Sequence, residues 1–366
     1  MKIECGKDKI KDAVVILGKI AAKSLSLPIL QTILIEAKNK NLILRATNLD
    51  IGLEIKIPAK IERDGIVAIP GDILSLFLSG LSDGQTVKME LINNNISIST
   101  QRNSTIIKCF PPDDFPIIPR VEKDNFFSID ANKLVSGIKS VLYSASLSDM
   151  KPEISSVYIY NDSDDIVFVA TDSFRLAEKK IPNPDKDKKM SIIFPIKNII
   201  EAARVFEQST DILDVYFNKN QISIISPSIY FTSRVVGGIF PDYKQIIPKQ
   251  KTTESVILKK DLLDSIKISN IFSDKFNQIN IKIISEDSRF EISSKNQDRG
   301  ESSTVVPATI EGTSVDINLN AKYILDCLQS ISSDSIHMIF NDSNKPVILK
   351  GIGDGSFLYL VMPMNN

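Results

Sequence analysis

The fold of this chain is decided by the segment VAIPGDILSLFLSGL (67–81), which recurs in altered letters as IIFPIKNIIEAARVF (192–206) and INLNAKYILDCLQSI (317–331). In each segment an extended apolar run ends at Pro70, Pro195 or Asn320, and a pattern typical of a helix follows. These residues are spaced 125 apart. A strand–helix word at a fixed spacing indicates a repeated structural unit, so the sequence predicts three repeats.

Two further series recur at nearly the same spacing. Apolar and polar residues alternate through residues 87–91, 213–217 and 336–340, and each run leads through an Asn-containing turn to a second apolar segment, which predicts a β-hairpin. Helices are expected at 7–23, 131–146 and 259–273, each followed by two strands. In the first two repeats these strands end in the similar words RATNLDIGLEIKI (45–57) and VATDSFRLAEKKI (169–181).

Each repeat therefore reads helix, strand pair, helix, strand pair, with extra strands at the joins and linkers near 120–125 and 248–253. Two helices on one face of an antiparallel sheet bury its apolar side, so the fold class is α+β. Six helices per chain become twelve in a homodimer. At roughly 10 Å per helix they would line a circumference of about 120 Å, with a hole somewhat under 30 Å that admits a DNA duplex.

Composition limits the function classes. A net charge of −1 argues against an ordinary basic nucleic-acid binder, although a local basic surface remains possible. The three cysteines are far apart and are expected to be reduced. With neither a signal-peptide pattern nor a membrane-length apolar run, we expect a cytoplasmic protein. Backbone contact with DNA is plausible for basic residues on or beside the predicted helices: Lys7, Lys9, Lys11, Lys19, Lys23, Lys133, Lys139, Lys197, Arg204, Lys259, Lys260, Lys267 and Lys322.

Signals for catalysis are weak. The GIGDG segment (351–355) lacks the strand–turn–helix context of a phosphate-binding loop and is interpreted as a hairpin turn. His337 is the only histidine, it is expected on the polar face of its strand, and it has no obvious nucleophile partner. Two alternatives to a DNA-enclosing ring stay open: a protein-binding scaffold that never binds DNA, and an enzyme acting at a domain junction.

Several words resemble one family, the bacterial DNA polymerase III β subunits or β sliding clamps: VATDSFRLAEKKI, GGIFPDYKQIIPK (237–249), YLVMPMNN (359–366), PPDDFPIIP (111–119) and LPIL (27–30). The resemblance covers the whole chain. It implies clamp domains at 1–121, 125–248 and 252–366, with sheets outside and helices inside, closed into a head-to-tail dimeric ring. It also implies no catalysis and no cofactor, and the sequence itself offers no constellation of metal-ligating residues. The partners implied are duplex DNA, the DNA polymerase III alpha subunit, the clamp loader, other polymerases and repair proteins.

The resemblance also assigns three sets of site residues. A pocket for a short partner peptide would be lined by Ile154, Thr171, Ser173, Phe174, Arg175, Leu176, Pro241, Ile246, Phe276, Asn320, Tyr323, Asn344, Pro346, Val361, Met362, Pro363 and Met364. DNA would meet Lys23, Ser24, Lys151 and Lys197. The dimer contact would join Thr105–Ile107 to Ile271 and Phe272.

This chain departs from the family pattern near the pocket. Ser173-Phe174 replaces a common Gly-His pair, Gln245 replaces a basic residue, and Asn365-Asn366 replaces a common Arg-Leu ending. At the DNA side Ser24 stands where a basic residue is common, so Lys23 is expected to substitute. The third repeat has a degenerate counterpart of the Thr-Asp word, SSKNQDRGESS (293–303), so one pocket per chain is expected.

Overall fold

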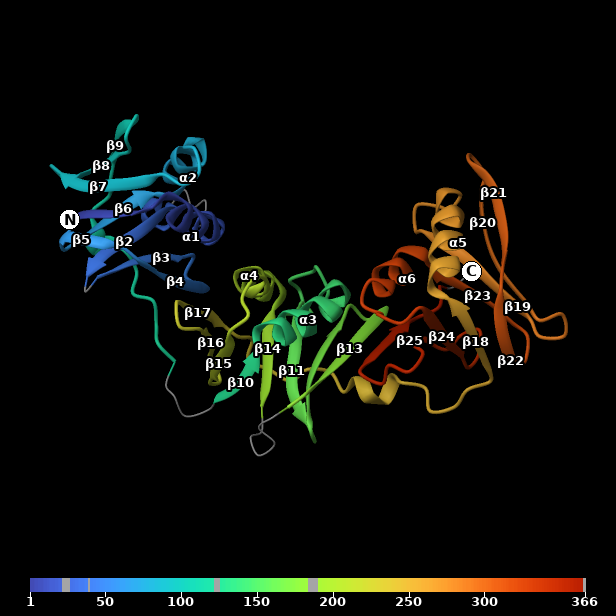
Figure 1. The fold of residues 1–366 in the computed structure, drawn as a ribbon. Helices are drawn as coiled ribbons and strands as arrows, with labels where there is room; N and C mark the ends of the chain where they lie inside the picture. The colour runs from blue at the N-terminus through green and yellow to red at the C-terminus, as the bar shows by residue number, and fades with distance from the viewer. Residues whose placement is uncertain (22–26, 39, 122–125, 184–189, 365–366) are drawn as a thin grey trace. The chain divides into compact units, whose positions relative to one another are not determined.

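A computed structural model describes residues 1–21, 27–38, 40–121, 126–183 and 190–364 (Figure 1). The chain forms two compact units. The first compact unit contains residues 1–132 and 204–235, and the second contains residues 133–203 and 236–366. The middle repeat therefore contributes strands to both units, which the spacing of the repeats does not predict.

The three strand–helix words fold as predicted. In the third segment Asn320 is the N-cap of the helix. Its side-chain oxygen accepts a hydrogen bond of 3.1 Å from the backbone N–H of Tyr323, as is typical of an N-cap asparagine. The strand and helix of the three segments are, in order, β6 (Gly65–Pro70) and α2 (Gly71–Gly80), β14 (Ser191–Pro195) and α4 (Ile196–Phe206), and β23 (Val315–Asn320) and α6 (Ala321–Leu328).

The three helices that open the repeats are also present. Two end earlier than predicted, at Ile20 and Ile271, and the middle one changes to a 3₁₀ turn after Val141. The helices are α1 (Lys7–Ile20), α3 (Ala131–Val141) and α5 (Lys259–Ile271), and the 3₁₀ turns are η1 (Pro28–Gln31), η2 (Pro112–Asp114), η3 (Leu142–Ser144) and η4 (Tyr243–Ile246).

The first compact unit contains two antiparallel sheets, and α1 packs against α2 and against β3 and β4. Asn93 and Asn94 both have positive φ in the turn between β7 and β8, as a tight two-residue hairpin turn requires. The five-stranded sheet runs β5 (Lys60–Arg63), β1 (Lys2–Gly6), β7 (Thr86–Ile92), β8 (Asn95–Ser99), β9 (Ser104–Lys108). The eight-stranded sheet runs β10 (Phe126–Asp130), β15 (Ile212–Phe217), β16 (Gln221–Ile225), β17 (Ile229–Arg234), β4 (Ile51–Pro58), β3 (Asn41–Thr47), β2 (Thr32–Lys38), β6.

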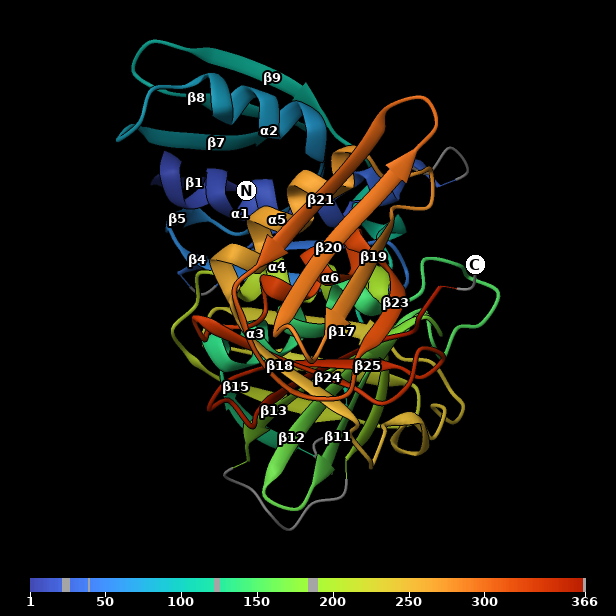
Figure 2. The same ribbon diagram turned by 90° about the vertical axis from the view of Figure 1, so that its right-hand side faces the viewer.

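The second compact unit has a nine-stranded and a four-stranded antiparallel sheet. The α5 helix packs on β19, β20 and β21, and Figure 2 shows these strands passing in front of α5 and α6. The nine-stranded sheet runs β14, β11 (Ser156–Asp162), β12 (Asp165–Thr171), β13 (Arg175–Pro182), β26 (Phe357–Val361), β25 (Val347–Gly351), β24 (Ser335–Phe340), β18 (Thr253–Leu258), β22 (Ala308–Gly312). The four-stranded sheet runs β21 (Gly300–Val306), β20 (Arg289–Asn296), β19 (Gln278–Ile284), β23.

Both sheets that join repeats do so by pairing one strand from each. In the first compact unit β4 pairs with β17, with Leu53 opposite Phe231. In the second, β13 pairs with β26, with Leu176 opposite Leu360. These four side chains are at most 1% exposed, so each join lies in a buried core.

The predicted linkers are only partly described. Residues 122–125 of the first lie outside the described residues, and Thr253 of the second already belongs to β18. The GIGDG segment forms the turn between β25 and β26, with Gly353 at a φ of 78°, so the hairpin interpretation is confirmed.

Candidate functional site: an apolar pocket at the end of the chain

An apolar pocket of about 380 Å³ opens on the second compact unit where the chain ends. Two phenylalanines on its rim are largely exposed, Phe174 at 62% and Phe276 at 56%. Exposed aromatic side chains around a hollow are typical of a surface that binds another molecule. The lining consists of Phe174, Phe276, Asn320, Tyr323, Met362, Pro363 and Met364, seven of the seventeen residues predicted for the partner pocket.

The turn between β12 and β13 presents Phe174. Asp172 accepts hydrogen bonds from the backbone N–H groups of Phe174 and Arg175, both at 3.0 Å. Thr171 Oγ1 accepts from the Ser173 N–H at 3.1 Å and donates to the Arg175 carbonyl at 2.7 Å. Ser173 has a φ of 78°, a left-handed conformation in which glycine carries no Cβ penalty. The Thr-Asp word therefore builds a rigid turn that holds Phe174 outward.

Arg175 links the turn that carries Phe174 to helix α6, which carries Tyr323. Its Nε donates to Asp172 at 2.9 Å, its Nη1 donates to Asp326 of α6 at 2.8 Å, and its guanidinium carbon lies 4.3 Å from the centre of the Tyr323 ring. Burial lowers the pKa of Arg175, but the hydrogen bond to Asp326 and the charge of Asp172 outweigh burial and raise it. The arginine stays charged and fixes Tyr323 through cation–π contact. Sequence reasoning did not single out Asp326, because its partner lies 151 residues away.

The end of the chain forms the opposite wall. Beyond β26, the Met362 N–H donates to the Phe174 carbonyl and the Met364 N–H donates to the Asn318 carbonyl, both at 2.8 Å. Pro363 between them has no N–H and cannot extend a β-ladder, so the strand stops and both methionines turn to the pocket. Methionine is flexible and polarizable, and it adapts to differently shaped apolar partners.

The remaining wall comes from the loop before β19. Asp274 accepts the N–H groups of Phe276 at 2.9 Å and Gln278 at 3.1 Å, which bends the chain around Phe276. The Asn320 amide then donates to the Phe276 carbonyl at 3.0 Å. Asn320 therefore has two structural roles, because it caps α6 and fixes the aromatic rim.

The first compact unit repeats the turn but not the pocket chemistry. Thr47 and Asn48 make the same hydrogen bonds as the Thr-Asp pair, and Leu49 has a φ of 76°. The positions equivalent to Phe174 and Met362 are held by Asp50 and Arg234, which approach within 3.9 Å as an exposed ion pair. A charged pair gives an apolar anchor no surface to bury, so this turn does not duplicate the apolar wall.

Ten predicted pocket residues do not line the pocket. Thr171, Ser173 and Arg175 shape its turn, while Leu176 and Val361 are buried in the strands beneath it. The other five are not part of its lining, although Pro241, Ile246 and Asn344 are exposed: Ile154, Pro241, Ile246, Asn344 and Pro346. Leu176 is 0% exposed, so a bound molecule cannot contact it across from Met362 and Met364.

Of the four predicted DNA contacts, two can be placed. Lys23 and Ser24 lie outside the described residues. Lys151 is exposed, and Lys197 is exposed but paired with Asp149 at 2.7 Å. An exposed ion pair of this kind contributes about 0–1 kcal/mol, so Asp149 holds the Lys197 ammonium group only weakly.

One lysine of the broader basic set is not available to DNA. Lys7 has a fully buried side chain that donates a hydrogen bond to Asp83 and pairs with Asp8. The sequence interpretation of Lys7 as part of a basic surface is therefore wrong. Lys259 donates to the Ile331 carbonyl at 2.5 Å and stabilises the region after α6.

The predicted dimer residues lie on an edge strand of the first compact unit and at the C-terminal end of α5 in the second. Thr105 and Ile107 are on β9, the edge strand of the five-stranded sheet. Ile107 is only 5% exposed, so it needs no cover, and the apolar side chain exposed on this strand is its neighbour Ile106 at 69%. Ile271 is 60% exposed at the end of α5, and Phe272 beside it is half-buried.

No group of metal-ligating side chains appears in the part of the chain that the structure describes. His337 pairs with Glu254 at 2.8 Å on the sheet surface, as its alternating position predicts. All three cysteines are free thiols, and burial raises the pKa of Cys5 to about 12. Among the described helices, none has both the length and the apolar character of a membrane span.

Proteins similar to this chain in sequence or structure include beta sliding clamps and DNA polymerase III beta subunits. A beta sliding clamp of Synechococcus elongatus is 24% identical over 100% of this chain and 99% of its own length, and one of Staphylococcus aureus is 27% identical over 93% and 92%. The crystal structure of the DNA polymerase III beta subunit of Thermotoga maritima covers 100% of this chain and 99% of its own, with a TM-score of 0.93 and 27% identity. A Pseudomonas aeruginosa sliding clamp covers all of both chains, with a TM-score of 0.96 and 21% identity, and so shares the fold.

Fold and comparisons together define a DNA sliding clamp of replication, built from three clamp domains with antiparallel sheets and paired helices. Three sequence profiles match in order: the N-terminal domain over residues 1–119, the central domain over 128–242 and the C-terminal domain over 244–365. They account for nearly the whole chain. The chain belongs to the DNA polymerase III beta subunit family.

Proposed function

We propose that this chain works as a cytoplasmic, non-catalytic homodimeric ring that encloses duplex DNA without reading its sequence. In this proposal each chain contributes domains at 1–121, 125–248 and 252–366, joined head to tail. The ring holds the DNA polymerase III alpha subunit, the clamp loader, other polymerases and repair proteins on the duplex. They bind through a short peptide motif, and no cofactor is needed.

The observation that carries the proposal is the apolar pocket. A rigid turn, a helix N-terminus and the end of the chain meet around a hollow of about 380 Å³, lined mostly by Phe, Tyr, Met and Pro side chains. Such a hollow accepts two or three apolar anchors of a peptide, while Asn320 offers a polar group for orientation. A methionine wall suits a protein that must bind several partners in turn.

The net charge of the chain favours a protein that stays on DNA because it encloses the duplex, and not because it binds the duplex tightly. A net charge of −1 leaves little general attraction to phosphates, and the exposed lysines Lys151 and Lys197 would add only contacts to the phosphate backbone, which do not depend on base sequence. Direct affinity for DNA is therefore weak and salt-dependent. A protein that must stay on DNA without tight binding has to enclose it.

The exposed edges support a dimer. Among the described strands, β9 pairs only with β8 and presents Ile106, while β21 pairs only with β20 and lies on α5, which ends at exposed Ile271. Unpaired strand edges with exposed apolar residues favour pairing with another chain. Head-to-tail pairing of one edge with the other closes a ring of two chains.

The test is retention on DNA of defined topology. The protein is assembled on a closed circular plasmid by a bacterial clamp loader, free protein is removed by gel filtration, and half of the sample is cut once with a restriction enzyme. We expect the protein to remain with the circle and to leave the linear form. Equal loss from both forms refutes enclosure, and a monomer mass by light scattering at all concentrations refutes the dimer.

A further inference from the structure

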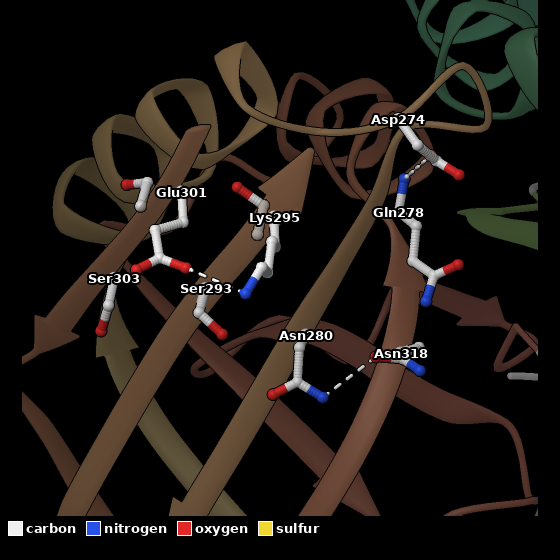
Figure 3. Close-up of a pocket in the computed structure, with 10 residues that line it drawn as sticks. Asp274, Gln278, Asn280, Ser293, Lys295, Glu301, Ser303 and Asn318 are labelled. Carbon is white, nitrogen blue, oxygen red and sulfur yellow. Dashed lines mark hydrogen bonds and ion pairs between the residues drawn. The ribbon is translucent and has the colours of Figure 1, made fainter. Parts of the chain in front are cut away.

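A polar groove of about 640 Å³ crosses the face of the four-stranded sheet that is opposite α5 (Figure 3). It is larger than the apolar pocket, and its lining contains no apolar side chain. The lining residues are Asp274, Gln278, Asn280, Ser293, Ser294, Lys295, Glu301, Ser302, Ser303 and Asn318. A hollow built only from amides, hydroxyls and charges suits a hydrogen-bonding occupant, not an apolar one.

The polar groove is continuous with the apolar pocket through shared backbone. Phe276 lines the pocket, while Asp274 and Gln278 on either side of it line the groove. On β23, Asn320 lines the pocket and Asn318 lines the groove, and the Asn318 carbonyl also holds the N–H of Met364. A chain leaving the pocket over β23 and β19 therefore enters the groove directly.

The groove offers unused hydrogen-bonding groups. Within the described residues, the Gln278 amide, the Ser293 hydroxyl and the second carboxylate oxygen of Asp274 have no hydrogen-bond partner. Asn280 is already oriented, because its amide nitrogen donates to Asp316 at 2.7 Å and to Asn318 at 3.0 Å. Oriented amides and free hydroxyls on a rigid sheet lose little entropy when they bind an extended backbone.

The charges select the flanking chemistry. The first oxygen of Asp274 accepts two backbone N–H groups, which leaves the other oxygen open to a cation. At the far end, Lys295 pairs with Glu301 at 3.4 Å, and both side chains are mostly exposed. The Asp274 end of the groove therefore suits a basic residue of the partner. The rest of the groove, as far as Lys295 and Glu301, suits hydroxyl or amide side chains.

We propose that the partner polypeptide anchored in the apolar pocket continues through this polar groove as an extended polar segment with a basic residue facing Asp274. This inference rests on the proposed peptide-binding function. Four strands spaced about 4.8 Å apart span about 14 Å, which an extended chain crosses in about four or five residues. Two partners with the same apolar anchors would then bind with different affinities if the residues next to those anchors differ.

The test uses two lengths of one labelled peptide. The short peptide carries leucine and phenylalanine anchors only. The long peptide adds five residues of Ser, Gln and Lys, and it is made in two versions, one extended at the N-terminus and one at the C-terminus. Both are titrated by fluorescence anisotropy against the full chain, against Gln278→Ala with Ser293→Ala, and against the control Gln329→Ala, an exposed glutamine outside both hollows.

We expect one long version to bind the intact protein about fivefold tighter than the short peptide, the effect of one or two added hydrogen bonds. The double variant should lose this advantage and keep the affinity for the short peptide, and the control should change neither. Equal affinity for all lengths, or an advantage that survives in the double variant, overturns the inference and leaves the pocket intact. Failure of the short peptide to bind the intact protein refutes the proposed function and the inference with it.

Discussion

Removal of residues 362–366 should abolish most partner binding without unfolding the protein. Met362 and Met364 are half-buried and provide two of the seven side chains that line the apolar pocket. Full burial of a methionine is worth about 1.5–3 kcal/mol, so closing a half-buried one contributes about 1 kcal/mol. The loss of both therefore costs about 2 kcal/mol, or about thirtyfold in Kd.

The cost to the fold is smaller than a core deletion. The truncation removes the hydrogen bonds from Met362 to Phe174 and from Met364 to Asn318, each worth about 1 kcal/mol. It also removes Met362 from its contact with the core cluster around Leu176 and Leu360. The strand β26 keeps its register with β13 and β25, so the truncated chain should fold and dimerise.

The assay is fluorescence anisotropy with a labelled partner peptide, together with circular dichroism and light scattering on the same samples. The matched control is a chain that lacks only residues 365–366 and keeps both methionines. We expect the control to bind within about twofold of the intact chain. Unchanged binding by the longer truncation, in a folded dimer, refutes the pocket as the partner site.

Three further predictions concern the rim of the pocket, the dimer contact and a buried carboxylate. Phe174→His should change the ranking of a peptide panel in anisotropy more than it changes thermal stability, because Phe174 is 62% exposed and contributes little to the core. Ile271→Ala with Phe272→Ala should shift the dimer toward monomer in light scattering, since each truncation of a large side chain buried at an interface costs roughly 2–5 kcal/mol. Glu54 on β4 is 2% exposed, and its carboxylate accepts hydrogen bonds of 2.8 Å from Arg45 and from Arg120. Burial raises the pKa of Glu54, but the hydrogen bond from Arg45 and the charge of Arg120 outweigh burial and lower it. Its stabilising effect is therefore present above the unfolded value of about 4.3 and is lost as pH falls through the lower folded pKa. Glu54→Gln should lower the free energy of unfolding by about 2 kcal/mol at pH 7, and urea titrations should show this difference shrinking below about pH 4.

The sequence predicted what is periodic. The strands of the three words end at Pro70, Pro195 and Asn320, and a helix follows each of them, because the local apolar pattern decides both elements. The Thr-Asp turn was recognisable by its letters, and the structure shows its hydrogen bonds at Thr171 and Asp172. The pocket residues came from the family resemblance, and seven of them line one hollow.

What the sequence did not predict depends on contacts between distant residues. Nothing in the sequence near Lys7 indicates that its ammonium group will donate a hydrogen bond to Asp83, which is 76 residues away. This contact is what keeps the Lys7 side chain away from the surface. The period of a strand does not say which face is buried when both faces carry isoleucine, so Ile106 and Ile107 were not distinguished. The polar groove has no motif, because its lining comes from four strands and a loop.

The pairing of β4 with β17, and of β13 with β26, has a consequence for anyone who cuts the gene into pieces. The repeats are similar in length, but they are not independent parts, since each boundary between repeats runs through the middle of a continuous sheet. A fragment that carries the middle repeat alone would expose two long apolar strand edges, β17 on one side and β13 on the other, and such edges template aggregation. Each compact unit consists of two separate segments of the chain, so no continuous fragment contains one unit alone. Expression trials should therefore keep the three repeats together, and proteolysis should release no stable single repeat.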